Sequence, residues 1–211
     1  MSAPLAAEEG GMILHCIRHG VTPSNLAGRF NDSEDESIDA SAVEVLKTLA
    51  IGPEAYDRVY VSPMRRCIET AEHLGLRDWT LEPRIAERGL GVFQGLTPNE
   101  CQSLYGEPFD AFQRFEAEPA IPQGESRGAH LERVKDWLEE ASRAGHDRVL
   151  AITHGEVIDF LYRLSGAHPI HGGEHIFAGE NLAVSSFEVD WPKVRLLGFS
   201  EALDPAPRTA P

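Results

Sequence analysis

The sequence predicts a three-layer α/β/α sandwich with a mostly parallel central sheet and a small helical lobe over the candidate site. Short apolar runs alternate with longer amphipathic stretches, a pattern typical of α/β chains. The last two apolar runs follow one another directly and predict an antiparallel pair. The 211 residues suffice for one full core. We expect one domain over 12–200, with its lobe at about 97–123, and loose tails at 1–11 and 201–211.

The individual elements follow from periodicity and turn residues. Apolar runs predict strands at 12–17, 58–61, 79–81, 149–153, 183–189 and 194–199. Helical spacing between glycines and prolines predicts helices at 40–51, 98–105, 108–116, 126–144 and 157–164. Ser62 before Pro63 favours the start of another helix, with Ser62 as its cap and Arg66 in its first turns.

Three of the predicted strands end in residues suited to an anion. The first leads into Arg18, His19 and Gly20, the second to Arg66 and the fourth to His154. Carboxyl ends of parallel strands meet at one edge of a sheet, where α/β proteins bind their ligands. Guanidinium groups match phosphate oxygens, and fixed cations stabilise the charge of a phosphoryl group. These side chains therefore predict a phosphoryl site, at which Gly20 allows a sharp turn and close approach of the ligand.

Composition limits the partners. The formal net charge of −15 argues against nucleic acid and anionic membranes, because both would be repelled. No apolar run approaches the roughly 18 residues of a membrane span, and 1–11 lacks the pattern of a signal peptide. The cysteines Cys16, Cys67 and Cys101 are odd in number and widely spaced, without a disulfide framework or metal-ligand spacing. We expect a cytoplasmic monomer or homodimer acting on a small molecule.

Six motifs follow one another in a specific order along the chain. They are Arg18-His19-Gly20 with Thr22 and Asn25, Gly28-Arg29-Phe30, Ser62-Pro63-Met64-Arg65-Arg66, Glu87 in Glu-Arg-Gly-Leu-Gly-Val-Phe-Gln-Gly, Gly124-Glu125-Ser126, and His154-Gly155. Together they resemble the histidine phosphatase superfamily, also called the phosphoglycerate mutase-like proteins, over about 12–187. Arg-His-Gly alone would be a weak signal, whereas the ordered set is specific.

The resemblance implies a role for each residue of the site. His19 would be the nucleophile that takes the phosphoryl group and becomes a phosphohistidine. Arg18, Asn25, Arg66 and His154 would hold the phosphoryl oxygens. Elementary electrostatics agrees, because neighbouring guanidiniums disfavour the imidazolium and leave His19 able to attack. The chemistry implied by the family needs no metal and no other cofactor.

Glu87 matches the family's proton donor to the leaving oxygen, which later serves as base for the attacking water. Glu82 and Glu100 are rival candidates in the same region. The predicted cations would lower the pKa of Glu87, which opposes its role as an acid. Burial and an arriving phosphate would raise it, and the sequence leaves the balance open.

Two segments fit none of these motifs. Five acids lie within 31–39, namely Asp32, Glu34, Asp35, Glu36 and Asp39. They form either a solvated loop or a rim that disfavours polyanionic substrates, while a calcium loop would need a glycine that is absent. Further on, a possible metal set comprises His168, His171, Glu174 and His175. Its spacing matches no common site, so a solvated loop or a substrate rim near Asn181 is favoured.

The predicted lobe leaves the substrate open. Its phenylalanines, Phe109, Phe112 and Phe115, form either its own core or an apolar wall for the substrate. Mutases of the family carry a longer basic insertion, whereas 107–124 offers Arg114 against four acids. A phosphomonoesterase of a small metabolite is therefore the first hypothesis. A cofactor-dependent phosphoglycerate mutase is the second, and a catalytically silent phosphate-binding module is the third.

Overall fold

The computed structural model describes residues 11–31, 36–49, 51, 55–117, 121–172 and 179–203. Within these ranges it contains a six-stranded mixed sheet in the order β3-β2-β4-β1-β5-β6. The strands are β1 (Met12–Arg18), β2 (Arg58–Val61), β3 (Thr80–Leu81), β4 (Arg148–Thr153), β5 (Val184–Asp190) and β6 (Lys193–Glu201). The first four run parallel, and β5 pairs antiparallel with both β1 and β6. The predicted α/β class and the predicted antiparallel pair are confirmed.

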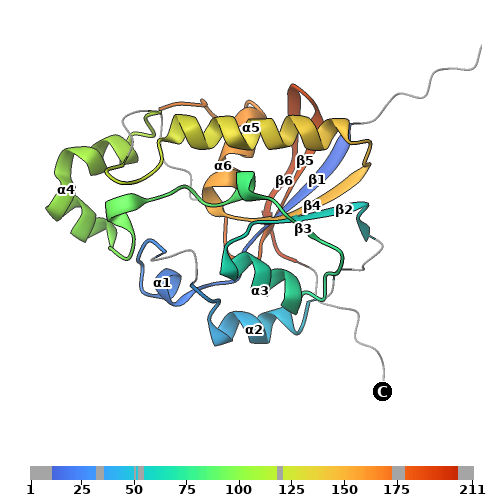
Figure 1. Cartoon of the computed structure of the whole chain (residues 1–211), viewed down its shortest axis with the longest axis horizontal. Coiled ribbons are helices and arrows are strands. Elements are labelled where there is room, and N and C mark those ends of the chain that lie inside the picture. The colour runs from blue at the N-terminus through green and yellow to red at the C-terminus, as the bar shows by residue number, and fades with distance from the viewer. Residues whose placement is uncertain are drawn as a thin grey trace, which may run out of the picture.

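Helices cover both faces of the sheet (Figure 1). On one face lie α5 (Arg127–Arg143) and α6 (Gly155–Leu164), and on the other lie α2 (Ala40–Leu46) and α3 (Arg65–His73). Strand β4 is buried on both sides, so its side chains alternate between two cores. Val149 and Ala151 pack in the core with α5 and α6, whereas Leu150 and Ile152 pack in the core with α2 and α3.

The helix α4 (Pro98–Gln113) forms the predicted lobe region at one end of the molecule (Figure 1). Its backbone leaves helical geometry at Tyr105 and Gly106, which agrees with the two short helices predicted there. Phe109 and Phe112 belong to a separate apolar cluster in this region. Phe115 does not, because it lies in the main core with the guanidinium carbons of Arg127 and Arg163 at 3.4 and 3.6 Å from its ring centroid. The prediction that Phe115 belongs to the lobe core was wrong.

The helix ends show where local sequence signals predict the structure correctly and where they do not. Ser126 caps α5 by accepting a hydrogen bond from the Ala129 amide at 3.1 Å, as its position predicts. The helix predicted over 40–51 is shorter, because the turn after Leu46 ends α2 early. Ser62 is not a helix cap: α3 begins at Arg65, and the Ser62 hydroxyl bonds the ring of His154 instead.

Short helical turns complete the described chain. They are α1 (Pro23–Leu26), η2 (Pro83–Ile85) and η3 (Gly91–Phe93). Among the described residues, no helix combines the length and the apolar composition needed to cross a bilayer.

The strand order positions the candidate site. Strand β4 lies between β1 and β2, so three consecutive parallel strands end at the same edge. Arg18 pairs with Thr153 in the sheet, and the next residues, His19 and His154, therefore emerge side by side. Ser62 follows β2 and its amide donates to the Ile152 carbonyl at 3.0 Å. Sheet register thus brings together segments that are far apart in the sequence.

Candidate active site

His19 is held in one orientation at the end of β1. Its side chain is only 1% exposed, and its Nδ1 lies 2.8 Å from the carbonyl oxygen of Gly20. A carbonyl oxygen only accepts hydrogen bonds, so Nδ1 carries the proton and donates it. The lone pair of the neutral ring is therefore on Nε2, the nitrogen that a nucleophile needs.

The surroundings keep His19 uncharged. Burial lowers the pKa of His19 well below its usual value, and the nearby guanidiniums of Arg66 and Arg18 lower it further. The hydrogen bond to Gly20 acts in the opposite direction but is outweighed. At neutral pH the imidazole is thus unprotonated.

His154 lies against His19, with the two ring centroids 5.2 Å apart. It is fully buried, and its Nε2 lies 2.7 Å from the hydroxyl oxygen of Ser62. Burial also lowers the pKa of His154 well below its usual value, helped by Arg66 and His19. Ser62 at 2.7 Å and the Cys67 Sγ at 3.4 Å both lie against Nε2, whereas Nδ1 has only the Cys67 Sγ at 4.0 Å among the described contacts. Nδ1 is therefore the less engaged nitrogen and the one better able to contact an oxyanion.

The two predicted arginines approach both histidines. Arg66 lies in the first turn of α3 and is only 2% exposed, while Arg18 is the last residue of β1. Arg18 donates from Nη1 to the Gly179 carbonyl at 2.8 Å, and its side chain passes over Gly155. Both guanidiniums act electrostatically on His19 and His154. The structure therefore brings these four predicted side chains together.

Asn25 completes this cluster from α1. It forms a capping box with Thr22, which fixes the start of this short helix. The Asn181 amide donates to the His19 carbonyl at 2.8 Å and lies 3.4 Å from Asn25 Oδ1. Asn181 thus ties Asn25 to the end of β1.

Gly20 lies close to Ile38 and Ala42. A Cβ at this position would lie 3.1 Å from Ala42 Cβ and 3.2 Å from Ile38 Cγ2, so a side chain would require these neighbours to shift. The Gly20 amide donates to Thr70 Oγ1 at 2.9 Å. Packing therefore also favours a glycine here, and the close approach of a ligand stays a prediction.

Glu87 is the carboxylate that faces the arginines of the site. Arg66 and Arg18 both act on it, whereas its rivals are engaged elsewhere. Glu82 pairs with Arg84 at 2.7 Å, and Glu100 belongs to the capping box at the start of α4. Loss of water contact and the Glu156 carboxylate raise the pKa of Glu87, against the opposite effect of the arginines.

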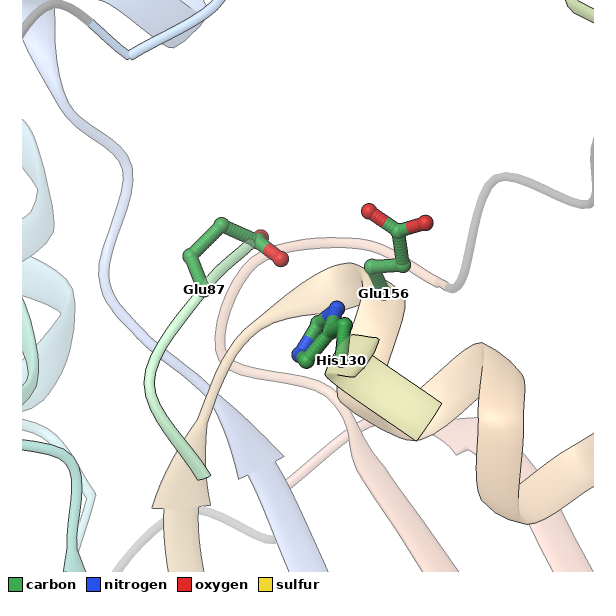
Figure 2. Close-up of side chains that lie close together, drawn as sticks. All are labelled: Glu87, His130 and Glu156. Atoms are coloured by element: carbon green, nitrogen blue, oxygen red, sulfur yellow. The ribbon is translucent and has the colours of Figure 1, made fainter. Parts of the chain in front are cut away.

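A cluster of charged residues behind Glu87 was not predicted. Figure 2 shows the side chains of Glu87, His130 and Glu156 close together, and one ligand-type atom from each lies within 4.8 Å of the others. Arg88 and Arg127 contact Glu156 at 2.9 and 2.8 Å. The signal available in the sequence was the position of Glu156, directly after His154-Gly155 at a strand exit.

The acidic segment is partly described. The side chain of Glu36 accepts hydrogen bonds from the Ser24 amide at 2.8 Å and from Asn31 Nδ2 at 2.6 Å. These bonds and Arg66 lower the pKa of Glu36, although partial burial opposes them. Asp39 caps α2. The other three acids, Asp32, Glu34 and Asp35, lie outside the described residues.

The histidine-rich segment is also partly described. His168 lies 3.3 Å from Arg163 Nη1, and His171 is exposed. Arg163 also donates to the Pro169 carbonyl at 2.6 Å, which fixes this loop to α6. Glu174 and His175 lie outside the described residues.

Comparison with known families agrees with this geometry. The model of the histidine phosphatase superfamily (branch 1) matches residues 14–201. The chain therefore belongs to the histidine phosphatase superfamily, as its motifs indicated.

Two curated relatives carry more specific names. A metal-independent phosphoserine phosphatase of Arabidopsis thaliana is 30% identical over 155 residues, which cover 69% of this chain and 65% of the relative. Phosphoserine phosphatase 1 of Hydrogenobacter thermophilus is 28% identical over 153 residues, covering 69% and 72%. The match thus spans just under two thirds of the plant relative.

Solved structures show the same fold. YhfR of Bacillus stearothermophilus has a TM-score of 0.75 at 23% identity, covering 90% of this chain and 98% of that one. A putative alpha-ribazole-5'-P phosphatase of Escherichia coli has a TM-score of 0.72 at 22% identity, covering 92% and 98%. At such identities the likeness concerns the fold alone.

Proposed function

We propose that this protein is a phosphomonoesterase that removes phosphate from a small metabolite through a phosphohistidine on His19. The observation that carries the proposal is the buried, neutral His19 with its Nδ1 proton committed to Gly20, beside His154 at 5.2 Å. An imidazole in this state can attack phosphorus without first losing a proton. Arg18 and Arg66 supply fixed positive charge for the phosphoryl oxygens.

In the first step, Nε2 of His19 forms a bond to phosphorus as the bond from phosphorus to the leaving oxygen breaks. Protonated Glu87 gives its proton to that oxygen, so the substrate leaves as a neutral alcohol. Arg18, Arg66 and the Nδ1–H of His154 stabilise the oxygens of the transferred group. The side-chain amide of Asn25 is a further hydrogen-bond donor for these oxygens at the edge of the site.

In the second step, water attacks the phosphohistidine. Glu87, now a carboxylate, takes one proton from the water as the new oxygen–phosphorus bond forms and the nitrogen–phosphorus bond breaks. Orthophosphate leaves, His19 is restored, and Glu87 is again protonated. The cycle therefore needs neither metal nor other cofactor, and the plant relative that is named a metal-independent phosphoserine phosphatase supports this.

Phosphoserine is the first substrate to test, because two relatives are named phosphoserine phosphatases. A phosphoglycerate mutase is the second candidate, supported by a phosphoglycerate mutase-like relative of 28% identity. The described lobe favours the phosphatase, since its Arg114 is paired with Glu116 at 2.6 Å instead of being available for a substrate carboxylate.

A panel of phosphorylated metabolites, assayed in chelator for released orthophosphate, tests the proposal. Phosphoserine, phosphoglycerates and sugar phosphates belong in the panel, and rapid quenching with 32P-labelled substrate detects the phosphoenzyme. We expect orthophosphate release and an acid-labile, base-stable label on His19. Transfer between phosphoglycerates without release would indicate the mutase, and phosphate binding without either reaction would indicate a silent module.

A further inference from the structure

Two carboxylates lie close together at the candidate active site, although only one has a chemical role in the proposed reaction. Glu87 comes from the loop between η2 and η3, and Glu156 comes from the first turn of α6. Figure 2 shows both carboxylates near the ring of His130, and one ligand-type atom from each of the three residues lies within 4.8 Å of the others. Two carboxylates at this distance disfavour each other's ionisation.

Glu156 is the one that stays ionised. Its Oε2 accepts from Arg88 Nε at 2.9 Å and its Oε1 accepts from Arg127 Nε at 2.8 Å. Both arginines are nearly fully buried, as is the carboxylate. Burial opposes ionisation, but these two guanidiniums outweigh it and lower the pKa of Glu156.

We propose that Glu156 is a positioning residue for Glu87: its fixed negative charge lies beside the Glu87 carboxyl and favours the protonated form, so that Glu87 can hold a proton for the leaving group. The inference deepens the proposed function and rests on it. It also answers the question left open by the sequence, namely how an acid survives beside two arginines.

The groups facing Glu87 come from every neighbouring element. Arg18 comes from β1, Arg66 comes from α3, and the backbone amide of Arg88 donates to Glu87 Oε1 at 3.1 Å; all three favour the ionised form. The opposing charge comes from Glu156, and Coulomb's law makes its effect large at this distance in a buried site.

The remaining neighbour, His130 of α5, is neutral. It is fully buried, and burial lowers its pKa to about 3. Within the described structure neither of its ring nitrogens has a hydrogen-bond partner. His130 therefore carries no positive charge that could neutralise either carboxylate.

The same cluster has the residue types of a metal site, but its charges oppose a cation. Both oxygens of Glu156 are already engaged by guanidiniums, and Arg18 and Arg66 approach Glu87 from the other side. A divalent ion would have to displace two buried ion pairs and meet four cationic groups. Mutual tuning of two carboxylates is the better account of the cluster.

The test compares Glu156→Gln with the charge-retaining Glu156→Asp. The measurement is the pH profile of kcat/KM on an alkyl phosphoester, whose leaving group needs a proton. Loss of the charge in Glu156→Gln lowers the pKa of Glu87 and moves the basic limb down by about one pH unit. Glu156→Asp keeps the wild-type limb, and so does Glu82→Gln, which removes a buried carboxylate paired with Arg84 instead. An unchanged basic limb in Glu156→Gln overturns the inference.

A direct measurement protects the test against misfolding, because Glu156→Gln leaves two buried arginines with a weaker partner. In the wild-type protein, a 13C-glutamate NMR titration assigned through Glu87→Gln reports the protonation of Glu87 itself. We expect Glu87 to titrate above the ordinary range for glutamate. Titration of Glu87 at or below about 4.3 refutes the inference without any variant of Glu156.

The two proposals fail in different ways. Absence of both turnover and phosphohistidine in the wild-type protein refutes the proposed function, whatever Glu87 does. Normal wild-type turnover with Glu87 titrating at or below about 4.3 leaves the proposed function standing and refutes the role of Glu156.

Discussion

The candidate active site has two walls, and different kinds of structural element position the side chains of each wall. The strand wall, consisting of His19, Arg66 and His154, follows the ends of β1, β2 and β4, and sheet register places it. The glutamate wall, consisting of Glu87, Arg88, His130 and Glu156, comes from a loop and two helices. Ion pairs between distant segments, such as Arg88 with Glu156, place these groups.

The difference separates the two chemical tasks of the proposed reaction. The strand wall surrounds a base with cations and keeps it unprotonated. The glutamate wall places a second negative charge beside an acid, and burial together with that charge raises the pKa of the acid. One site thus favours the neutral form of both an imidazole and a carboxyl, because the added charge beside each group repels the charge that the group would carry.

The largest effect is expected for the strand wall. His19→Ala removes the proposed nucleophile, and we expect turnover to fall by about 10⁴-fold or more on every phosphoester. The acid-labile label in a rapid-quench experiment should disappear as well. His171→Ala, at an exposed histidine outside the pocket, is the matched control and should keep both. If the His19→Ala protein still became labelled, the nucleophile would have to be a residue other than His19.

The next effect concerns the glutamate wall and depends on the substrate. Glu87→Gln keeps the shape of the side chain but removes its proton, so esters with poor leaving groups should lose about 10²- to 10⁴-fold in rate. Nitrophenyl phosphate needs little protonation and should lose far less in the first step. Steady-state kinetics on both substrates measures the ratio. Equal losses would contradict the role of Glu87 as the acid.

The two walls also differ in how far the sequence predicts them. Periodicity gives the strands, and an apolar run ending in Arg18-His19 indicates both the sheet edge and its chemistry. For Glu156 the sequence offers only its position after His154-Gly155, and this is a weak signal. An acidic residue in the first turn of a helix is ordinary, and its partners, Arg88 and Arg127, are distant in the chain. Ion pairs between residues that are distant in the sequence therefore cannot be predicted from local sequence patterns.

Single residues show the same limit. Ser62 before Pro63 has the local features of a helix cap, but the neighbouring strand supplies His154 as a stronger partner. Phe115 follows the lobe in sequence, yet two buried arginines of α5 and α6 hold it in the main core. In both cases a tertiary contact overrides a valid local preference.

A smaller effect is expected from Arg66, and it tests the electrostatics of the strand wall. Arg66→Gln removes a cation that lowers the pKa of His19, so that pKa rises toward its ordinary value. A higher pKa means that His19 protonates earlier as the pH falls, and the acid limb of kcat should move up by about one unit. The pH profiles of the wild type and the variant are measured on the same substrate. Ionisation of the substrate then affects both profiles equally and does not change the difference between them.

Arg66→Lys is the control for this prediction, because it keeps the charge but not the planar fork. We expect KM to rise while the acid limb stays near its wild-type position. An acid limb that moves equally in both variants would show that packing around Arg66, and not its charge, sets the protonation of His19.

The smallest effect is expected for Ser62, which acts on the strand wall only through His154. Ser62→Ala removes the 2.7 Å hydrogen bond to Nε2 and leaves this buried nitrogen with the weaker contact to the Cys67 Sγ at 3.4 Å. One such bond contributes about 1 kcal/mol, which corresponds to a loss of about tenfold at most in kcat/KM. Ser62→Thr keeps the hydroxyl and should restore the rate. Because the nucleophile and the acid are untouched, both limbs of the pH profile should stay in place, and a shifted limb would mean that Ser62 affects His19 or Glu87 directly.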